Sequence, residues 1–364
     1  MARSARHRVT RAWEQGFPGA ASRVLGAAGG GYRGLVAARD WLYARGVLKS
    51  RAMDVPVVSI GNLTVGGTGK TPAVELAVQT LITLGHRPAI VSRGYGRTSR
   101  GVQVVADDAT IRLDAEDAGD EPFMLARRLP GVPVLVGSNR HEAARRARER
   151  FGVSIVVLDD GFQHRTIRKD LEVVMARAAQ PWGNGRLLPA GPLREPLAAL
   201  RRAHLVVATG AVKSEDAADV AAAAALHAPH APVLAARYVP TECWEASTMR
   251  PIPLPSLAAR HLLAFAGIAR PAAFEQSLAA AEIRVDETVA FPDHHWYRLT
   301  ELQGLAVRAR AHGADGLVTT EKDWVRLRRL GPTALPIYVF GVRLELIADE
   351  AAWWAAFERA CPSR

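Results

Sequence analysis

The chain has 364 residues, of which 49% are hydrophobic and 23% are charged. This length favours two domains over one, and this composition excludes an intrinsically disordered protein. The net charge of +11 favours anionic partners, namely nucleic acid, phosphorylated small molecules or an anionic membrane surface, without choosing among them. Cys243 and Cys361 lack the spacing of a metal site, and we expect reduced thiols in a cytosolic protein.

The chain begins with a basic lead segment over residues 1–50, in which residues 34–49 are predicted to form an amphipathic helix. Leu35 and Trp41 belong to its apolar material, and Arg33 and Arg45 lie around it. Two interpretations stay open. The helix either lies in a membrane interface with its arginines on anionic lipid, or packs on the domain that follows. No secretory signal and no membrane-spanning segment is expected elsewhere in the sequence.

Apolar strands then alternate with helices. Strands are predicted at 56–60, 87–92, 132–136 and 154–158, and helices at 71–84, 121–129 and 141–150. Such alternation is typical of a parallel sheet with helices on both faces.

Residues 180–198 interrupt this pattern with three glycines and four prolines, which indicates a long functional loop or a linker. The alternation resumes afterwards, with strands at 205–209, 261–266, 317–320 and 337–340, and helices at 216–226, 271–281, 299–311 and 351–360. We therefore predict a first α/β domain over 51–199, a smaller second α/β domain over 200–345, and a C-terminal helix within 346–364.

The segment between the first strand and the first helix of this alternation has the composition of a phosphate-binding loop. It reads Thr64-Val65-Gly66-Gly67-Thr68-Gly69-Lys70-Thr71. Glycines let the backbone curl around an anion, and the helix N-terminus adds its dipole. Lys70 is expected to contact the β- and γ-phosphates of ATP, and the Thr71 hydroxyl to ligate Mg²⁺. The first domain is thus predicted to be a P-loop NTPase-type parallel sheet.

A second feature of such sites is an acidic residue at the end of a neighbouring buried strand. The strand at 154–158 is followed by Asp159 and Asp160. One of these carboxylates is predicted to hold magnesium, directly or through water. The sequence leaves open which of the two does so.

The loop alone is compatible with two classes of protein. Partition-type ATPases, which act as dimerising switches, carry a signature lysine just before the paired glycines, and this chain has Val65 there. This difference counts against the switch, which is kept as the alternative to a metabolic kinase. A nucleic-acid protein is suggested only by the charge, because neither an aromatic-rich basic ribbon nor zinc spacing is present. We expect no nucleic-acid partner and no obligate protein partner.

Seven motifs occur in order between about residues 50 and 325. They are the loop from Gly61 to Pro72, Ser92-Arg93-Gly94-Tyr95-Gly96-Arg97, Gly119-Asp120-Glu121-Pro122, Asp159-Asp160-Gly161-Phe162-Gln163-His164, Leu188 to Pro196, Phe291-Pro292-Asp293-His294-His295, and Thr319-Thr320-Glu321-Lys322-Asp323. As an ordered set they resemble the tetraacyldisaccharide 4′-kinases, the lipid A 4′-kinases, in which Thr64 is no departure.

The resemblance implies transfer of the γ-phosphoryl group of ATP to the 4′-hydroxyl of tetraacyldisaccharide 1-phosphate, which gives lipid IVA. It also implies two α/β/α domains around a nucleotide cleft and a peripheral association with the cytoplasmic face of the bacterial inner membrane.

The resemblance further implies site residues. Asp120 is expected to be the general base and to act with His294, although His295 is an alternative partner, and Asp120 taken alone reads as a helix cap. Arg140 and Arg194 are expected to stabilise negative charge on ATP or on the 1-phosphate of the lipid. Two further pairs stand near these motifs: Gln163 and His164 are expected to face the cleft, while Lys322 and Asp323 either face the nucleotide or form a salt pair at a strand end.

Overall fold

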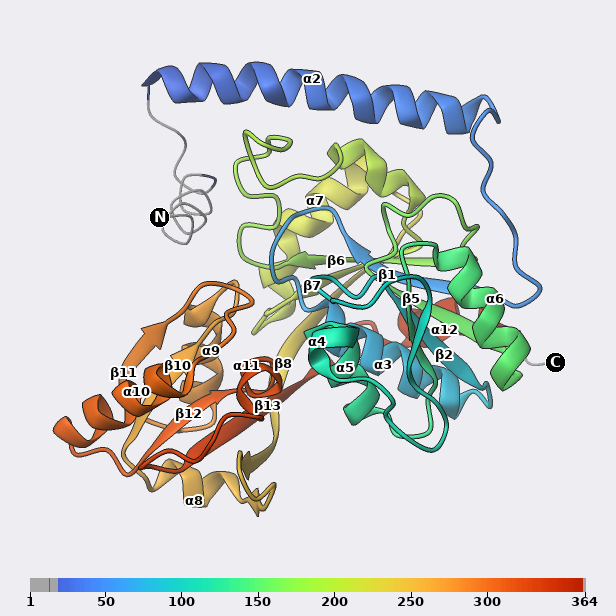
Figure 1. Ribbon diagram of the computed structural model, residues 1–364. Helices are drawn as coiled ribbons and strands as arrows, with labels where there is room; N and C mark the ends of the chain where they lie inside the picture. The colour runs from blue at the N-terminus through green and yellow to red at the C-terminus, as the bar shows by residue number, and fades with distance from the viewer. Residues whose placement is uncertain (1–12, 14–18, 363–364) are drawn as a thin grey trace. The chain divides into compact units, whose positions relative to one another are not determined.

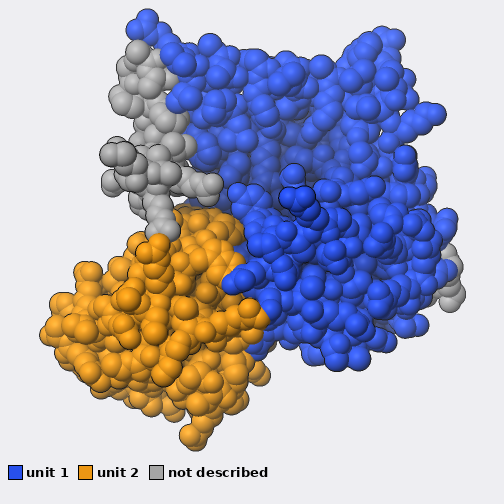
Figure 2. All heavy atoms as spheres, in the orientation of Figure 1, with its two compact units in different colours: residues 1–237, 344–364 blue, residues 238–343 orange. Residues whose placement is uncertain are grey.

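The computed structural model describes Trp13 and residues 19–362, and it divides this part of the chain into two compact units (Figures 1 and 2). Unit 2 comprises residues 238–343, and unit 1 comprises the residues before and after it. The boundaries differ from the predicted ones at 199 and 345. The strand at 205–209 pairs with the sheet of the first domain, which moves the boundary to residue 237. Unit 2 is therefore inserted between two parts of unit 1.

Unit 1 is built on a mostly parallel sheet with the strand order β7-β6-β1-β5-β2-β4-β3 (Figure 1). The strands are β1 (Val57–Asn62), β2 (Pro88–Ser92), β3 (Gln103–Ala106), β4 (Val134–Val136), β5 (Ile155–Asp159), β6 (Leu171–Arg177) and β7 (Leu205–Thr209). The start of β8 (Val233–Glu245) extends the sheet beside β7, and β3 is antiparallel to β4. The central strands are runs of buried Val, Ile and Leu, as a sheet covered on both faces requires. β6 was not predicted from the sequence.

Helices cover both faces of this sheet. The helices of unit 1 after the lead segment are α3 (Lys70–Thr83), α4 (Ala115–Ala118), α5 (Asp120–Arg128), α6 (Arg140–Phe151), α7 (Ala218–His227) and α12 (Glu350–Ala360), with short 3-10 turns η1 (Leu197–Arg202) and η2 (Ser214–Ala217). The crossover through α3 runs from β1 outward to β2, and that through α6 runs back from β4 to β5. Because crossovers are right-handed, opposite directions place α3 and α6 on opposite faces. α12 contacts α3, where Trp353 Nε1 donates to Thr80 Oγ1 at 2.9 Å.

The same topology defines where a ligand is expected. The chain leaves β1 toward β2 and leaves β5 toward β6, in opposite directions along the sheet. In open α/β sheets, ligands bind beyond the carboxyl ends of the strands at such a switch point. Ile60 of β1 lies in register with Asp159 of β5, so both strand ends open at this position.

The lead segment contains one long helix, α2 (Gly19–Ala44), which begins earlier than the predicted residue 34 (Figure 1). Residues 1–12 and 14–18 of the expected segment lie outside the described residues. α2 contacts the rest of unit 1, since Tyr32 Oη donates to the Arg194 carbonyl oxygen at 2.9 Å. Leu35 and Trp41 of the same helix are exposed. Among the described residues, no helix is long and apolar enough to cross a bilayer.

Unit 2 has its own parallel strands in the order β11-β10-β12-β13, with the later part of β8 beside β13. Its elements are β9 (Pro251–Ile252), α8 (Leu254–Ala258), β10 (Leu262–Ala266), α9 (Pro271–Ala280), β11 (Val285–Ala290), α10 (Leu299–Ala311), β12 (Gly316–Thr320), α11 (Glu321–Leu327) and β13 (Ile337–Leu346). The crossovers through α9 and α10 run in opposite directions along the sheet, which places these helices on opposite faces. Unit 2 is thus an α/β/α sandwich of the predicted kind.

Candidate active site

The loop between β1 and α3 can surround a phosphate group with its backbone. Gly66 and Gly69 have φ angles of 109° and 76°, which residues with a side chain rarely adopt. α3 starts directly after Gly69, at Lys70, and its first turn carries no acidic residue. Because the first N–H groups of a helix have no partner within it, this helix end favours an anion.

Neighbouring segments hold the loop in this shape. Asn62, the last residue of β1, donates from Nδ2 to the Thr64 carbonyl oxygen at 2.7 Å and to Thr68 Oγ1 at 2.9 Å. The Val65 amide donates to the carbonyl oxygen of Pro192 at 2.8 Å. The loop is therefore preorganised by the strand before it and by the long loop after β6. Asn62 was not among the predicted site residues, and its place at the end of the strand is the signal that could have found it.

Asp159 ends β5 with a side chain that is buried almost completely. Its Oδ2 accepts a hydrogen bond from Ser92 Oγ at 2.8 Å, and its Oδ1 has no hydrogen-bond partner within the described part of the chain. Burial, together with the negative charges of Glu121 and Asp160, raises the pKa of Asp159 to about 7. A buried carboxylate with an open oxygen is a position at which a cation is strongly stabilised.

Asp160, the next residue, has different surroundings. Its carboxylate oxygens lie 3.0 and 2.9 Å from Arg194 Nη1, and Lys70 Nζ lies 3.6 Å from Oδ1. Burial opposes ionisation of Asp160, but the charges of Lys70 and Arg194 outweigh it and hold the pKa of this carboxyl below its usual range. Asp160 is therefore paired with cations, whereas Asp159 is not.

Asp120 is the first residue of α5 and is buried. The helix-cap position belongs to Gly119, whose φ of 91° suits glycine, so Asp120 is not the cap that the sequence alone suggested. Asp120 Oδ1 accepts a hydrogen bond from the Glu121 amide at 3.0 Å. Glu121 was given no role from the sequence, yet its charge acts on the pKa of Asp159, which makes it part of the same acidic region.

Arg140 is the first residue of α6, and it is buried. Its Nε has no hydrogen-bond partner among the described residues. Burial lowers the pKa of Arg140, the charges of Asp159 and Asp160 oppose this shift, and the charges of Arg93 and Arg97 add to it. Arg140 thus lies within electrostatic reach of both aspartates and of two further arginines, an arrangement that suits a highly charged anion.

Gln163 and His164, which the sequence predicts to face the cleft, have the following contacts and surroundings. Gln163 Nε2 donates to the Asn62 carbonyl oxygen at 2.9 Å, and its Oε1 accepts from Arg194 Nη1 at 3.3 Å. Burial lowers the pKa of His164 to about 4, with Arg140 as the first of three cations that add to the shift. The His164 ring is therefore neutral at pH 7.

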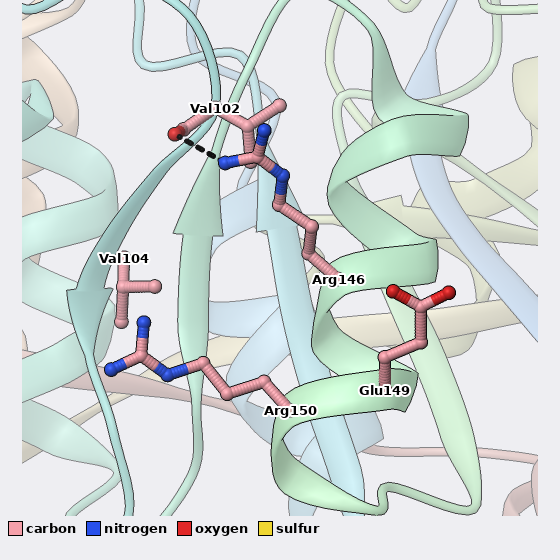
Figure 3. A pocket seen from close by; sticks show the side chains of 5 residues that line it. All are labelled: Val102, Val104, Arg146, Glu149 and Arg150. Carbon is pink, nitrogen blue, oxygen red and sulfur yellow. Dashed lines mark hydrogen bonds between the residues drawn. The ribbon is translucent and has the colours of Figure 1, made fainter.

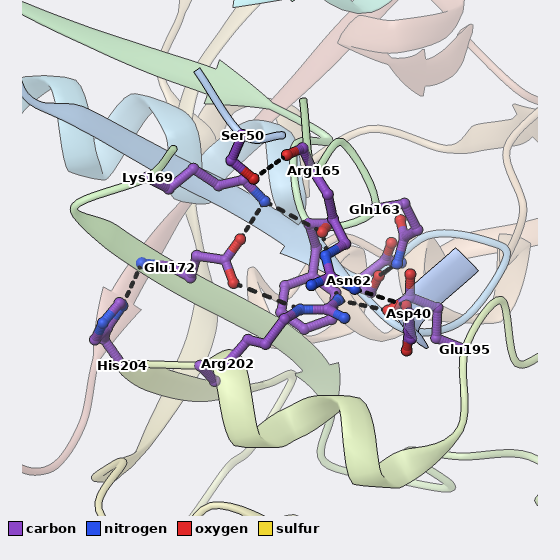
Figure 4. A network of polar contacts seen from close by, with 12 residues as sticks. Asp40, Ser50, Asn62, Gln163, Arg165, Lys169, Glu172, Glu195, Arg202 and His204 are labelled. Atoms are coloured by element: carbon purple, nitrogen blue, oxygen red, sulfur yellow. Dashed lines mark hydrogen bonds and ion pairs between the residues drawn. The ribbon is translucent and has the colours of Figure 1, made fainter. Parts of the chain in front are cut away.

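A buried ionic network joins α2 to the loop that carries Arg194 (Figure 4). The Glu195 side chain is completely buried, and its two carboxylate oxygens contact Arg39 of α2 and Arg202 of η1. Asp40 of α2 forms a second ion pair, with Arg165, at 2.7 Å. No local pattern predicts this network, because Arg39 and Glu195 are 156 positions apart.

In unit 2 the two candidate histidines have different surroundings. His295 is buried, stacks on Phe291 with ring centroids 4.8 Å apart, and has its Nε2 3.0 Å from the Glu301 carboxylate. The His294 side chain is 27% exposed, and its Nε2 lies 3.7 Å from the Asp293 carboxylate. His294 is therefore the more accessible of the two rings.

The interpretation of Asp323 as a residue that faces a nucleotide is not supported. Its side chain is completely buried and forms an ion pair with Arg326 at 2.7 Å, within α11. The strand-end salt pair expected with Lys322 is thus made with Arg326, one helical turn further along.

One surface hollow of about 220 Å³ lies away from these residues, between β3 and α6 (Figure 3). Val102, Val104 and the side chains of Arg146, Glu149 and Arg150 line it. Arg146 donates to the Val102 carbonyl oxygen at 3.4 Å. None of the predicted site residues lines this hollow, so it is separate from the phosphate loop.

The residues at the phosphate loop fit magnesium that arrives with a nucleotide. Within the described residues, no group of three or more His, Cys, Asp and Glu side chains could hold a metal by itself. Mg²⁺ usually keeps several waters and is held by one or two carboxylates plus phosphate oxygens. Thr71, in the first turn of α3, and Asp159 with its open oxygen form a donor set of this small kind.

The model of the tetraacyldisaccharide-1-P 4′-kinase family matches residues 21–361. The chain belongs to this family. It is 44% identical over 320 residues to the tetraacyldisaccharide 4′-kinase of Anaeromyxobacter dehalogenans strain 2CP-C, covering 86% of this chain and 85% of that one. It is 40% identical over 346 residues to the enzyme of that name from Geobacter sulfurreducens, covering 94% and 95%.

A solved structure supports the same assignment. The crystal structure of LpxK from Aquifex aeolicus in complex with ATP aligns with a TM-score of 0.71 and 28% identity, covering 90% of this chain and 96% of that one. The predicted α/β fold class, with a P-loop-type sheet and a second α/β unit, is confirmed. The amphipathic character of the lead helix toward a membrane stays a prediction.

Proposed function

We propose that this 4′-kinase transfers the γ-phosphoryl group of ATP to the 4′-hydroxyl of tetraacyldisaccharide 1-phosphate, which yields lipid IVA and ADP. The observation that carries the proposal is the phosphate loop at the carboxyl ends of β1 and β5, in a chain that matches the kinase family over residues 21–361. Val65 in place of the signature lysine argues against a partition-type switch.

The nucleotide side of the reaction belongs to unit 1. Lys70, 3.6 Å from Asp160 here, contacts the β- and γ-phosphates when ATP is bound. Thr71 and Asp159 hold the Mg²⁺ of the nucleotide, and that ion supplies charge neutralisation at the phosphate oxygens. Asp160 stays with Arg194. The open oxygen of Asp159 and the paired oxygens of Asp160 support these different roles for the two aspartates.

In the transfer step, Asp120 accepts the proton of the 4′-hydroxyl as that oxygen bonds to the γ-phosphorus. The bond from the γ-phosphorus to the β–γ bridging oxygen breaks, and ADP leaves with its electron pair. His294 acts with Asp120 by tuning its proton affinity, and Arg140 and Arg194 stabilise the charge that develops on the phosphoryl oxygens. The burial of Asp120 and Arg140 and the accessibility of the His294 ring support these roles.

A direct assay tests the function. The purified chain is incubated in detergent with γ-labelled ATP, Mg²⁺ and tetraacyldisaccharide 1-phosphate, and lipids are separated chromatographically. We expect a labelled bisphosphorylated lipid, and little hydrolysis when the acceptor is omitted. Folded protein that hydrolyses ATP at the same rate with and without acceptor, and that labels no lipid, would reject the proposal.

We place the enzyme peripherally at the cytoplasmic face of the inner membrane, in contact with anionic lipid. The exposed side chains of Leu35 and Trp41 on α2, near Arg33 and Arg45, support this location. Sedimentation with vesicles of pure zwitterionic or mixed anionic lipid tests it. Replacing both apolar residues by Ser should reduce binding to the anionic vesicles, and unchanged binding would argue against α2 as the contact.

A further inference from the structure

Asp323, in the first turn of α11, has a completely buried carboxylate with donors on both oxygens. Oδ1 accepts hydrogen bonds from the Gly267 amide at 2.9 Å, from Tyr297 Oη at 2.8 Å and from Arg326 Nη2 at 2.7 Å. Oδ2 accepts from Thr320 Oγ1 at 2.6 Å. Four donors, one of which is the paired Arg326 cation, compensate this carboxylate for its lost water. Its position is therefore rigid.

These contacts also fasten the turn of residues 291–297, which carries His294. The His294 amide donates to the Gly267 carbonyl oxygen at 3.1 Å, and the amide of Gly267 is held by Asp323. At the end of the turn, Tyr297 contacts Asp323 directly. Burial, and next the charge of Asp323, raise the pKa of Tyr297, so its hydroxyl keeps its proton and acts as the donor. The turn is thus tied to one carboxylate at two points.

The backbone at these points is constrained. His294 has a φ of 59°, in the left-handed region, where a residue with a side chain is strained and persists only if its surroundings hold it. Gly267 has little room for a side chain, because a Cβ there would lie 3.0 Å from Asp323 Oδ1, 3.0 Å from Tyr297 Oη and 3.1 Å from His295 Cβ. Gly267, Asp323 and Tyr297, which hold the turn, are therefore closely packed against one another.

We propose that Asp323 is a positioning residue for the phosphoryl transfer, which acts through Gly267 and Tyr297 to fix the turn that presents His294. The inference rests on the role proposed above for His294. A positioning role differs from a general contribution to folding in one measurable respect. If Asp323 acts by positioning, loosening the turn lowers the turnover number only in protein that still has the His294 side chain.

A double-mutant cycle tests this difference. Tyr297→Phe is the main variant, because it removes one hydroxyl and leaves the buried Asp323–Arg326 pair intact. Asp323→Asn is the second variant, and it removes the negative charge that pairs with the buried Arg326 cation, so its melting temperature is measured first. Tyr338→Phe, at a buried tyrosine of β13, is the matched control. The turnover number is measured with saturating ATP and lipid acceptor, with and without His294→Ala.

We expect Tyr297→Phe to lower kcat roughly tenfold or more with the KM for ATP unchanged, since small misplacements of reacting groups are costly. In the His294→Ala background the same change should cost less than about twofold. Equal factors in both backgrounds would overturn the positioning role and leave the proposed function intact, because the wild-type acceptor assay reports on that function separately.

A readout without turnover completes the test. With ¹³C-labelled histidine, the His294 ring signal is assigned by its loss in His294→Ala. Tyr297→Phe should shift or broaden this signal at temperatures well below its melting point, and Tyr338→Phe should not. An unchanged His294 signal in folded Tyr297→Phe protein would contradict the proposal, whatever the activity of the enzyme.

Discussion

Arg194 contacts both carboxylate oxygens of Asp160 through a single nitrogen, at 3.0 and 2.9 Å. The backbone of the same residue is also tied to the phosphate loop, because the Arg194 amide donates to the Leu63 carbonyl oxygen at 2.7 Å. Arg194 therefore connects the long loop after β6 to one strand-end aspartate and leaves the other, Asp159, with an open oxygen.

This difference predicts unequal effects on the magnesium requirement. Asp159→Asn should raise the Mg²⁺ concentration for half-maximal activity roughly tenfold or more, because it removes the open carboxylate oxygen. Asp160→Asn should raise it less, since that carboxylate is already occupied by Arg194. Mg²⁺ titrations at saturating ATP measure both values. A larger effect for Asp160→Asn would assign the metal to the other aspartate.

The proposed base and its partner should affect chemistry rather than nucleotide binding. Asp120→Ala and His294→Ala should each lower kcat by roughly 100-fold or more, the scale of lost general acid–base catalysis. ATP affinity, measured by calorimetry, should stay near the wild-type value. Asp117→Ala and His312→Ala, at exposed positions, are the matched controls. Near-normal turnover in both test variants would remove these residues from the active site.

His164 predicts how stability depends on pH. Its pKa is lowered to about 4 in the folded protein, from an ordinary value near 6.5, so the unfolded chain binds the proton more readily between these values. The contribution of His164 to the free energy of unfolding is therefore fully present above about pH 6.5, and it is lost as the pH falls toward 4. Urea unfolding between pH 7 and 4 should show that the His164→Gln variant loses less unfolding free energy than the wild-type protein as the pH falls. An identical slope would show that His164 is not responsible, and His312→Gln controls for removing an exposed imidazole.

The contact of Arg39 with Glu195 should decide how firmly α2 is held. Arg39→Ala leaves the buried Glu195 carboxylate with one cation instead of two, which should cost about 1–3 kcal/mol of unfolding free energy. Hydrogen exchange of the α2 amides should become faster. Arg33→Ala, at an exposed position of the same helix, is the control. Equal exchange in the two variants would mean that the ion pair does not hold the helix.

Two glycines should respond to alanine in opposite directions. A Cβ at Gly61 of β1 would lie 2.5 Å from Phe162 Cβ and 2.6 Å from the Phe162 amide nitrogen, so Gly61→Ala should destabilise unit 1 by about 1–3 kcal/mol. At Gly34 of α2 nothing lies within 4 Å, and Gly34→Ala should stabilise the helix by about 0.5–1 kcal/mol. Chemical denaturation measures both changes. A stabilised Gly61→Ala variant would contradict the close packing of β1 on the loop after β5.

Local patterns predicted most elements, and the failures have physical causes. β6 was missed because Glu172 interrupts its apolar sequence and Arg177 ends it. Glu172 is nonetheless buried, since it forms an ion pair with Lys169 and its amide donates to His204 Nδ1 at 2.9 Å. From the sequence alone, a charged residue of this kind is expected at the protein surface, because its buried partner is not known.

The domain boundary and part of the site depend on distant pairings. The strand at 205–209 looks like any other apolar strand, and only its register with β6, where Val174 pairs with Val206, assigns it to unit 1. The phosphate loop and Asp159 follow from short, ordered motifs and were predicted. The tie from Arg39 to Glu195 and the burial of Asp323 depend on three-dimensional contacts that no local pattern contains.

Because unit 2 is inserted before α12, the order of synthesis differs from the order of assembly. The ribosome makes β1 to β7 first, then all of unit 2, and only then α12, which packs behind the phosphate-loop helix through Trp353. Until that helix emerges, the α3 surface that it covers remains open to solvent or to chaperones. A nascent chain therefore completes unit 1 only after the inserted unit 2 has been synthesised.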